Sequence, residues 1–120
     1  MRTSLFIATI LTSTIAISTG AAADPTGSWK RPNGDAVEVY ACGGKLCGKI
    51  TSGSQKGFEM LHGMSKTGGS TWQGANMKHP DMPSVMTFNG TVTQSGDRLE
   101  VKGCAIGESL CDAEQWTRSK

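Results

Sequence analysis

Past its N-terminal segment, this chain of 120 residues has no excess charge of one sign, no helical periodicity and no familiar catalytic motif. Twelve basic residues against ten acidic ones form no basic cluster, which disfavours a nucleic-acid partner. The sequence has no Gly-x-Ser-x-Gly elbow, no His-Glu-x-x-His pair, no phosphate loop and no Rossmann fingerprint. These absences predict a protein that is not an enzyme.

The N-terminus has the layout of a cleavable export signal. Arg2 precedes the apolar stretch Leu5–Ile17, and small residues then lead up to Ala23. The stretch is too short and too rich in Thr and Ser for a good membrane span, although an uncleaved anchor helix is the alternative. We therefore expect residues 1–23 to be a signal helix removed after Ala23. Residues 24–120 would then form a single domain in the periplasm or outside the cell, without a stable membrane anchor.

Four cysteines predict disulfides, because an exported domain of fewer than about 100 residues buries only a small core. They flank two short Gly-containing segments, Cys42 to Cys47 and Cys104 to Cys111. Four cysteines allow three pairings. Loop length favours the two local bridges, since a Gly-containing turn brings the Cα atoms within bridging distance. The rival pairing, one loop joined to the other, requires that the two loops be neighbours. The spacings differ from the Cys-x-x-Cys of catalytic dithiols.

Alternating apolar and polar residues predict an all-β fold. Val37 and Val39 fall on one face of an extended segment, and Glu38 and Tyr40 fall on the other. Turn signals such as Gly43-Gly44 separate about seven such segments. Strands are expected at Gly27–Lys30, Ala36–Cys42, Lys45–Thr51, Thr71–Met77, Val85–Thr93, Leu99–Lys102 and Ala113–Arg118.

Short strands joined by tight turns indicate a small antiparallel up-and-down β-barrel, which leaves no exposed sheet edge. The least regular stretch, Ser52–Gly69, is expected to be a long connection with one short helical turn near Phe58–Leu61. We expect the three tryptophans to fill the core. Since the first and last strands of a closed barrel are adjacent, Arg118 is predicted to stack on the Trp29 ring at the closure. A Gly-x-Trp start with a late Arg resembles lipocalin-like barrels.

Three segments together resemble the bacterial family called domain of unknown function 2147. They are Asp-Pro-Thr-Gly-Ser-Trp at 24–29, Ala-Cys-Gly-Gly-Lys-Leu-Cys-Gly-Lys-Ile at 41–50, and the late Gly-Cys…Cys…Trp-x-Arg pattern within 101–118. The resemblance implies an exported, lipocalin-like β-barrel, with no established reaction and no catalytic residues. Where similar proteins have Asn-Pro or Asp-Pro and then Asp-Gly-Lys-x-Tyr, this chain has His-Pro-Asp-Met-Pro at 79–83.

Methionine and histidine gather in one part of the chain. Apart from the initiator, all five Met and both His lie between residues 60 and 86. Thioethers with imidazoles suit Cu(I), and alternate residues of an extended segment share a face. One interpretation is therefore a copper site, the only cofactor that the sequence suggests, with these candidate ligands: His62, Met77, His79 and Met82. The alternative is that Met simply fills an irregular core.

In a third interpretation, the same side chains line the mouth of the barrel. Flexible thioethers then form an adaptable apolar pocket. Its candidate lining is Met60, Met64, Trp72, Met77 and Met86. We expect a binding module for a small apolar or amphiphilic ligand. The alternatives are copper binding and an envelope protein partner, the latter engaged by an inhibitor-like module that presents Asp24–Gly27 or the Ser52–Gly69 loop.

Overall fold

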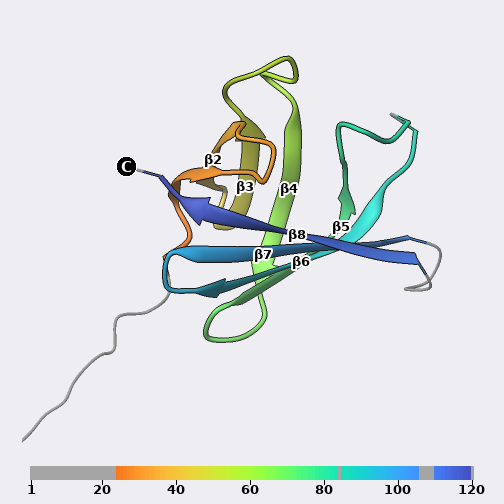
Figure 1. Ribbon diagram of the computed structural model, residues 1–120. Helices are drawn as coiled ribbons and strands as arrows, with labels where there is room; N and C mark the ends of the chain where they lie inside the picture. The colour runs from red at the N-terminus through yellow and green to blue at the C-terminus, as the bar shows by residue number, and fades with distance from the viewer. Residues whose placement is uncertain (1–23, 84, 106–109, 120) are drawn as a thin grey trace, which may run out of the picture.

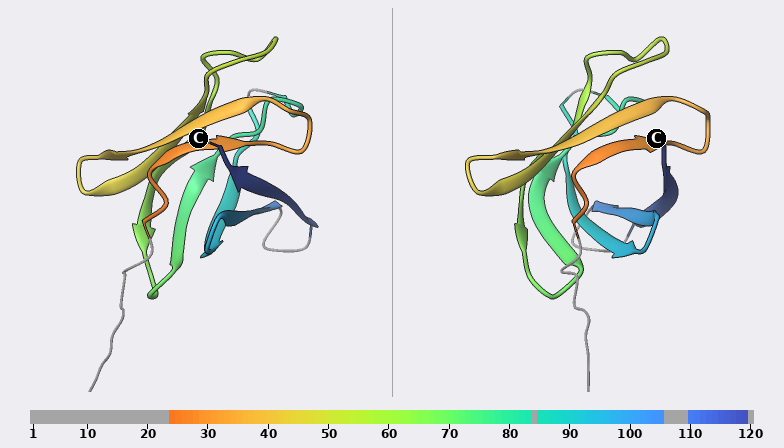
Figure 2. Two further views of the ribbon diagram at one scale, coloured as in Figure 1. Left: turned by 60° about the vertical axis from the view of Figure 1, so that its left-hand side comes forward. Right: turned by 90° about the vertical axis from the view of Figure 1, so that its left-hand side faces the viewer.

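The computed structural model describes residues 24–83, 85–105 and 110–119, so the predicted signal peptide lies outside it. Eight antiparallel strands follow one another around a closed barrel (Figures 1 and 2). Each strand pairs with the next, and the last pairs with the first. The strands are β1 (Gly27–Lys30), β2 (Ala36–Cys42), β3 (Lys45–Ile50), β4 (Glu59–Lys66), β5 (Thr71–Met77), β6 (Phe88–Ser95), β7 (Arg98–Ala105) and β8 (Leu110–Arg118).

The predicted all-β, up-and-down barrel is confirmed, and seven strands correspond to the seven predicted segments. Two strand starts differ from the prediction by three residues: β8 begins at Leu110 instead of Ala113, and β6 begins at Phe88 instead of Val85. The amide of Met86 donates to the Pro83 carbonyl at 2.9 Å, which keeps the chain in a turn up to that point. No helix in the described part of the chain is long and apolar enough to cross a membrane.

The long connection predicted for Ser52–Gly69, with its helical turn, is wrong because the stretch contains β4. The β3–β4 register shifts twice, once between Leu46 and Cys47 and once between Gly48 and Lys49. Each shift adds one unpaired residue on β4, as in a β-bulge, and Gly63 supplies the positive φ of 87° at one of them. The bulges break the two-residue alternation by which a strand is recognised in a sequence.

The barrel closes where β1 meets β8, with Trp29 opposite Arg118. The guanidinium carbon of Arg118 lies 4.3 Å from the centroid of the Trp29 ring, so the predicted contact is present. Arg118 also donates to the backbone carbonyls of Asp24, at 2.8 Å, and Thr26, at 3.1 Å. A Cβ on Gly27 would lie 3.1 Å from the Arg118 Nη1 atom, and the φ of this residue is +124°, so both features favour glycine there.

Both predicted local disulfides form, with S–S distances of 2.03 Å for Cys42–Cys47 and 2.09 Å for Cys104–Cys111. Two such bridges indicate an oxidising, extracellular type of compartment. The first joins β2 to β3 and the second joins β7 to β8. In an up-and-down barrel alternate connections lie at the same end. We call the end with the β2–β3, β4–β5 and β6–β7 turns the base, and the opposite end the mouth.

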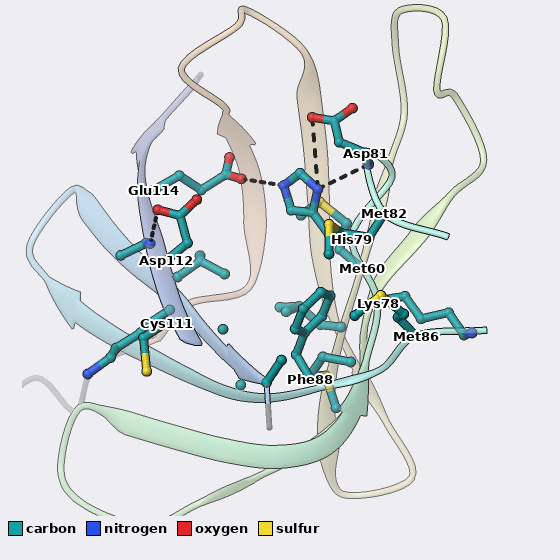
Figure 3. A pocket seen from close by; sticks show the side chains of 18 of the residues that line it. Met60, Lys78, His79, Asp81, Met82, Met86, Phe88, Cys111, Asp112 and Glu114 are labelled. Carbon is teal, nitrogen blue, oxygen red and sulfur yellow. Dashed lines mark hydrogen bonds and ion pairs between the residues drawn. The ribbon is translucent and has the colours of Figure 1, made fainter. Parts of the chain in front are cut away.

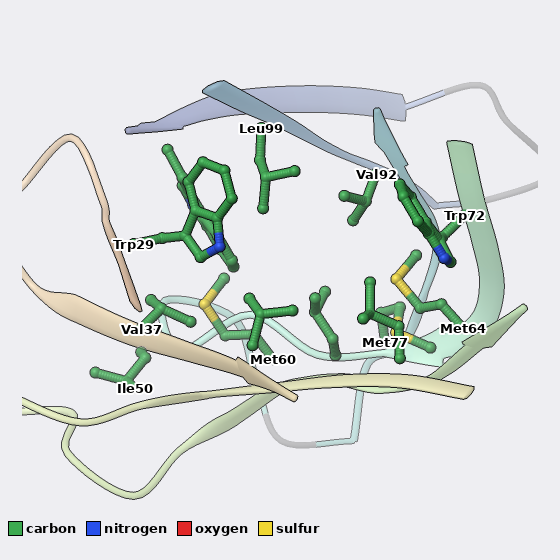
Figure 4. Packing of buried hydrophobic residues seen from close by; sticks show 13 residues of the cluster. Trp29, Val37, Ile50, Met60, Met64, Trp72, Met77, Val92 and Leu99 are labelled. Atoms are coloured by element: carbon green, nitrogen blue, oxygen red, sulfur yellow. The ribbon is translucent and has the colours of Figure 1, made fainter. Parts of the chain in front are cut away.

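The tryptophans fill the core, as predicted: Trp29 and Trp116 are fully buried and Trp72 is 6% exposed. Figure 4 shows aliphatic side chains from opposite walls meeting between these rings. The buried cluster is Trp29, Val37, Val39, Leu46, Ile50, Met60, Leu61, Met64, Trp72, Met77, Val92, Leu99 and Trp116.

Candidate functional site

A pocket of about 410 Å³ opens in the mouth half of the barrel (Figure 3). Its walls come from β4 to β8 and from the β5–β6 connection. Paired residues of β7 and β8 form one side, where Val101 is opposite Glu114, Gly103 opposite Asp112 and Ala105 opposite Leu110. The end of β7 and the start of β8 are tied together there by the Cys104–Cys111 bridge.

Every methionine except the initiator lines this one pocket: Met60, Met64, Met77, Met82 and Met86. The first three are almost completely buried, whereas Met82 is 37% exposed. The methionines therefore form a wall that runs from the interior out to the rim. In the buried cluster, the residues outside the pocket wall are Trp, Val, Ile and Leu. Thioether side chains are thus concentrated where the barrel is hollow.

The floor of the pocket consists of Met64 and Met77 packed on a pair of glycines. Gly74 of β5 is opposite Gly90 of β6. A Cβ on Gly90 would lie 2.7 Å from the Met77 Cγ atom, and one on Gly74 would lie 3.3 Å from the Met64 Cγ atom. The absence of side chains at these two positions therefore leaves room for both thioethers.

An irregularity in β5 turns Met77 inward. The β5–β6 register shifts between Gly74 and Met77, and Asn76 has a φ of 65° there. The Sδ atom of Met77 accepts a hydrogen bond of 3.1 Å from the His62 amide. β4 and β5 share two register pairs, Ser65–Gln73 and Lys66–Trp72. The hydrogen bond to Met77 joins the two strands further along, where they have no register pairs.

One side of the pocket is polar and is organised around the carboxylate of Glu114. Arg31, only 7% exposed, donates to both carboxylate oxygens, at 3.0 Å from Nε and 3.2 Å from Nη2. Trp116 Nε1 donates to Oε1 at 3.0 Å, and His79 Nε2 lies 3.1 Å from Oε2. Two oxygens thus face four nitrogen donors.

These donors decide the protonation state of Glu114. Burial alone would raise the pKa of this carboxyl group. The hydrogen bonds from Arg31, Trp116 and His79, together with the charge of Arg31, outweigh burial and lower the pKa below its usual value of 4.5. Glu114 is therefore ionised at neutral pH, and its negative charge compensates the buried Arg31.

The contacts of His79 define its tautomer. The amide of Asp81 donates to Nδ1 at 3.1 Å, so Nδ1 carries the lone pair. Nε2 then carries the proton and donates it to Glu114. Both ring nitrogens are engaged, and the imidazole connects the β5–β6 segment to β8, as Figure 3 shows.

A family model described as an uncharacterized protein conserved in bacteria (DUF2147) matches residues 51–118. The chain belongs to this family. The match confirms the resemblance seen in the sequence, and it includes every residue of the pocket wall. No curated protein and no solved structure matches the chain.

In this DUF2147 barrel most of the predicted ligand-binding residues lie together. Met60, Met64, Met77 and Met86 line the pocket. Trp72 does not line it: this residue lies opposite Lys66, beside the β4–β5 turn at the base, and fills the core there.

The predicted metal ligands of the DUF2147 barrel are only partly brought together. Met77, His79 and Met82 line the pocket. His62 is exposed, and its Nε2 atom lies 2.7 Å from the Glu59 carbonyl. The two bulges of β4 prevent alternate residues of this strand from sharing one face. Within residues 24–83, 85–105 and 110–119, no group of three His, Cys, Asp or Glu side chains is placed to hold a metal ion.

Arg31 and Glu114 belong to the site, but neither was predicted from the sequence to do so. A signal for Glu114 was present, because it lies two residues before Trp116 in a predicted strand and so shares the inward face. An acidic residue at a core-facing position requires a partner. Arg31 comes from the β1–β2 connection, 83 positions away, and its approach to Glu114 requires the closed barrel.

Proposed function

We propose that this DUF2147 barrel is an exported, non-enzymatic binding protein that holds a small apolar or amphiphilic ligand in its mouth pocket. The observation that carries the proposal is the collection of all five methionines of residues 24–120 around one cavity. Unbranched thioethers adapt to differently shaped apolar surfaces, and ligand pockets of about 300–1,000 Å³ are mostly apolar with a few polar groups. The pocket of about 410 Å³ fits that description.

The polar side of the pocket supports a binding function rather than catalysis. A general base needs a carboxylate or imidazole with a free lone pair directed at substrate. Glu114 receives its four donors, and the Nδ1 lone pair of His79 is directed at the Asp81 amide. These groups hold the mouth together, and the apolar wall is left to bind the ligand.

The structure favours this function over the two alternatives. An inhibitor-like module was expected to have a filled barrel and to present either the Ser52–Gly69 loop, in which Gly53, Ser54, Lys56 and Gly57 are exposed, or the Asp24–Gly27 segment. Instead there is a pocket, Pro25 is buried, and Arg118 binds two carbonyls of the segment. A copper site would need the Nδ1 lone pair of His79, which the Asp81 amide already occupies.

The first test is native mass spectrometry of protein isolated from the bacterial envelope without refolding. We expect a chain that begins at Asp24 and carries an organic mass, which leaves on denaturation. A bound copper mass would instead support the Met/His site. A bare chain from several growth conditions would contradict ligand binding and direct attention to protein partners.

A pocket-filling variant provides the second test. Gly103 lines the pocket, and a Cβ there would meet only the Phe88 side chain, at an ordinary 3.6 Å. Gly103→Val therefore adds methyl groups to the cavity without backbone strain, and valine suits a strand. We expect binding of the fluorescent probe 1-N-phenylnaphthylamine to weaken at least tenfold.

Gly69→Val is the matched control, since Gly69 is exposed and has open space around its Cβ position. It should bind the probe like the wild type. If Gly103→Val folds and also binds with unchanged affinity, the pocket is not the binding site.

A further inference from the structure

Given the proposed function, the shape of the pocket restricts the class of ligand that it can hold. We infer that it is a single-chain amphiphile whose unbranched apolar chain enters first, and that Met64 limits the length of that chain. Three properties of the pocket point to such a ligand: its volume, its closure toward the base and the chemistry of its floor.

The volume fits one chain. A water-sized group occupies about 30 Å³, so roughly 14 such groups fit into the cavity of about 410 Å³. A methylene group is of similar size. A chain of roughly 14 carbons therefore fills the whole cavity, and one of roughly 10 carbons leaves the space at the rim to the head group. A lipid with two such chains requires about twice the volume.

The pocket is closed toward the base because that part of the described barrel is filled. Beyond Met64 along β4 lies the base, where Trp72, Leu46 and Val92 are buried. Figure 4 shows Met64, Met77, Val92 and Trp72 side by side. A molecule that enters at the mouth therefore leads with its apolar end and stops at this layer.

Apart from Glu114, which is neutralised by Arg31 further inside, three acidic or imidazole groups of the pocket lie at the mouth. His79 and Asp81 belong to the β5–β6 segment, and Asp112 is near the start of β8. The exposed apolar side chains Met82 and Leu110 lie at the same end, at 37% and 61% exposure. A polar head at the mouth thus stays in contact with water and polar side chains, while its chain lies among thioethers.

Met64 is the residue that sets the depth. It is fully buried, it lines the pocket, and its side chain covers Gly74 and Gly90. Met64→Ala removes three heavy atoms from the floor. Since cavities left by such truncations collapse only in part, the pocket becomes deeper.

The test measures how straight-chain carboxylates and alkyltrimethylammonium ions of 6 to about 18 carbons displace 1-N-phenylnaphthylamine. In the wild type we expect affinity to rise about three- to fourfold per added carbon. It should peak at roughly 10–14 carbons with either head and then fall. In Met64→Ala the peak should move to chains two to three carbons longer.

Leu99→Ala is the matched control, because Leu99 is equally buried, loses the same number of heavy atoms and does not line the pocket. Its optimum should equal that of the wild type. If Met64→Ala does not fold, Met64→Val provides a smaller truncation, and the wild-type series tests the chain class by itself.

The outcomes separate this inference from the proposed function. If the probe binds and is displaced without a length optimum, or equally well by a two-chain lipid, the single-chain inference is wrong and the binding function stands. A folded Met64→Ala variant with the wild-type optimum removes the role of Met64. If neither the probe nor any chain binds, the binding function itself is wrong.

Discussion

Glu114 is the residue on which the organisation of the mouth depends. It is a charged group at an inward position of a small barrel, where burial favours the neutral acid. Arg31, Trp116 and His79, from three different parts of the chain, supply the donors that keep it ionised. Breaking this pair leaves the buried guanidinium with only the more distant carboxylate of Asp35, at 3.8 Å, which is costlier than losing an exposed ion pair.

The lowered pKa of Glu114 predicts a pH dependence of stability. Because the pKa is lower in the folded protein than in the unfolded chain, the ionised carboxylate stabilises the fold fully above pH 4.5. That contribution is lost as the pH falls through the folded-state pKa. We expect Glu114→Gln to lose about 2–3 kcal/mol at pH 7. Its unfolding free energy should also change less than that of the wild type between about pH 6 and pH 3.

Urea unfolding across this pH range measures both effects. Asp24→Asn is the control: hydrogen bonds from Thr26 lower the pKa of this carboxyl too, but it lies exposed at the base and should contribute little. Parallel pH profiles for wild type and Glu114→Gln would contradict the stabilising role of the carboxylate.

The role of a residue was predictable from the sequence where it depends on neighbours along the chain. It was not predictable where it depends on the closed barrel. The crowding of Met and His into residues 60–86 indicated the pocket lining, and the late Arg indicated the contact with Trp29. The meeting of Arg31 with Glu114 depends on the closed barrel, and no short pattern encodes it.

Among the elements, most strands were recognisable and β4 was not. β1 and β2 have the predicted bounds, and so does β5, although its register shifts near its end. β4 contains two bulges, so Met60 and Leu61 are both buried and the apolar positions lose their two-residue period. The same bulges place Met60 and Met64 inside and His62 outside, which separates His62 from the other predicted metal ligands.

The two disulfides lie at opposite ends of the barrel, and we expect their removal to affect ligand binding differently. Each closes a short loop, so replacing either pair by serine should lower the unfolding free energy by about 2–3 kcal/mol. Cys104–Cys111 ties β7 to β8 at the pocket, whereas Cys42–Cys47 ties β2 to β3 at the base. We expect Cys104→Ser with Cys111→Ser to weaken probe binding as well.

Cys42→Ser with Cys47→Ser is the matched control, with a similar loss of stability and unchanged probe affinity. Both are measured by urea unfolding and by titration with 1-N-phenylnaphthylamine. Equal effects of the two double variants on binding would show that the bridge at the mouth has no local role in the pocket.

At the scale of the whole molecule, two weakly paired seams determine how the barrel stays closed. β1 and β8 share two register pairs, as do β4 and β5. Side chains reinforce each seam: Met77 accepts the His62 amide at one, and Arg118 stacks on Trp29 at the other. The β4–β5 seam lies at the pocket, and the β1–β8 seam fastens the two ends of the described chain.

Arg118→Ala tests whether the closure depends on that side chain. The variant loses a cation–π contact with a buried ring and two hydrogen bonds to the carbonyls of Asp24 and Thr26. We expect a loss of about 2–3 kcal/mol in unfolding free energy and faster amide exchange in β1. Probe affinity should stay unchanged, because Arg118 is absent from the pocket wall.

Arg98→Ala is the control, since Arg98 is exposed and lies opposite Thr117, next to the same seam. Removing its charge should change stability by less than about 0.5 kcal/mol. If the two variants unfold alike and β1 exchanges at the wild-type rate, the strand pairs alone close the barrel. A loss confined to Arg118→Ala means that this side chain fastens the first strand to the last.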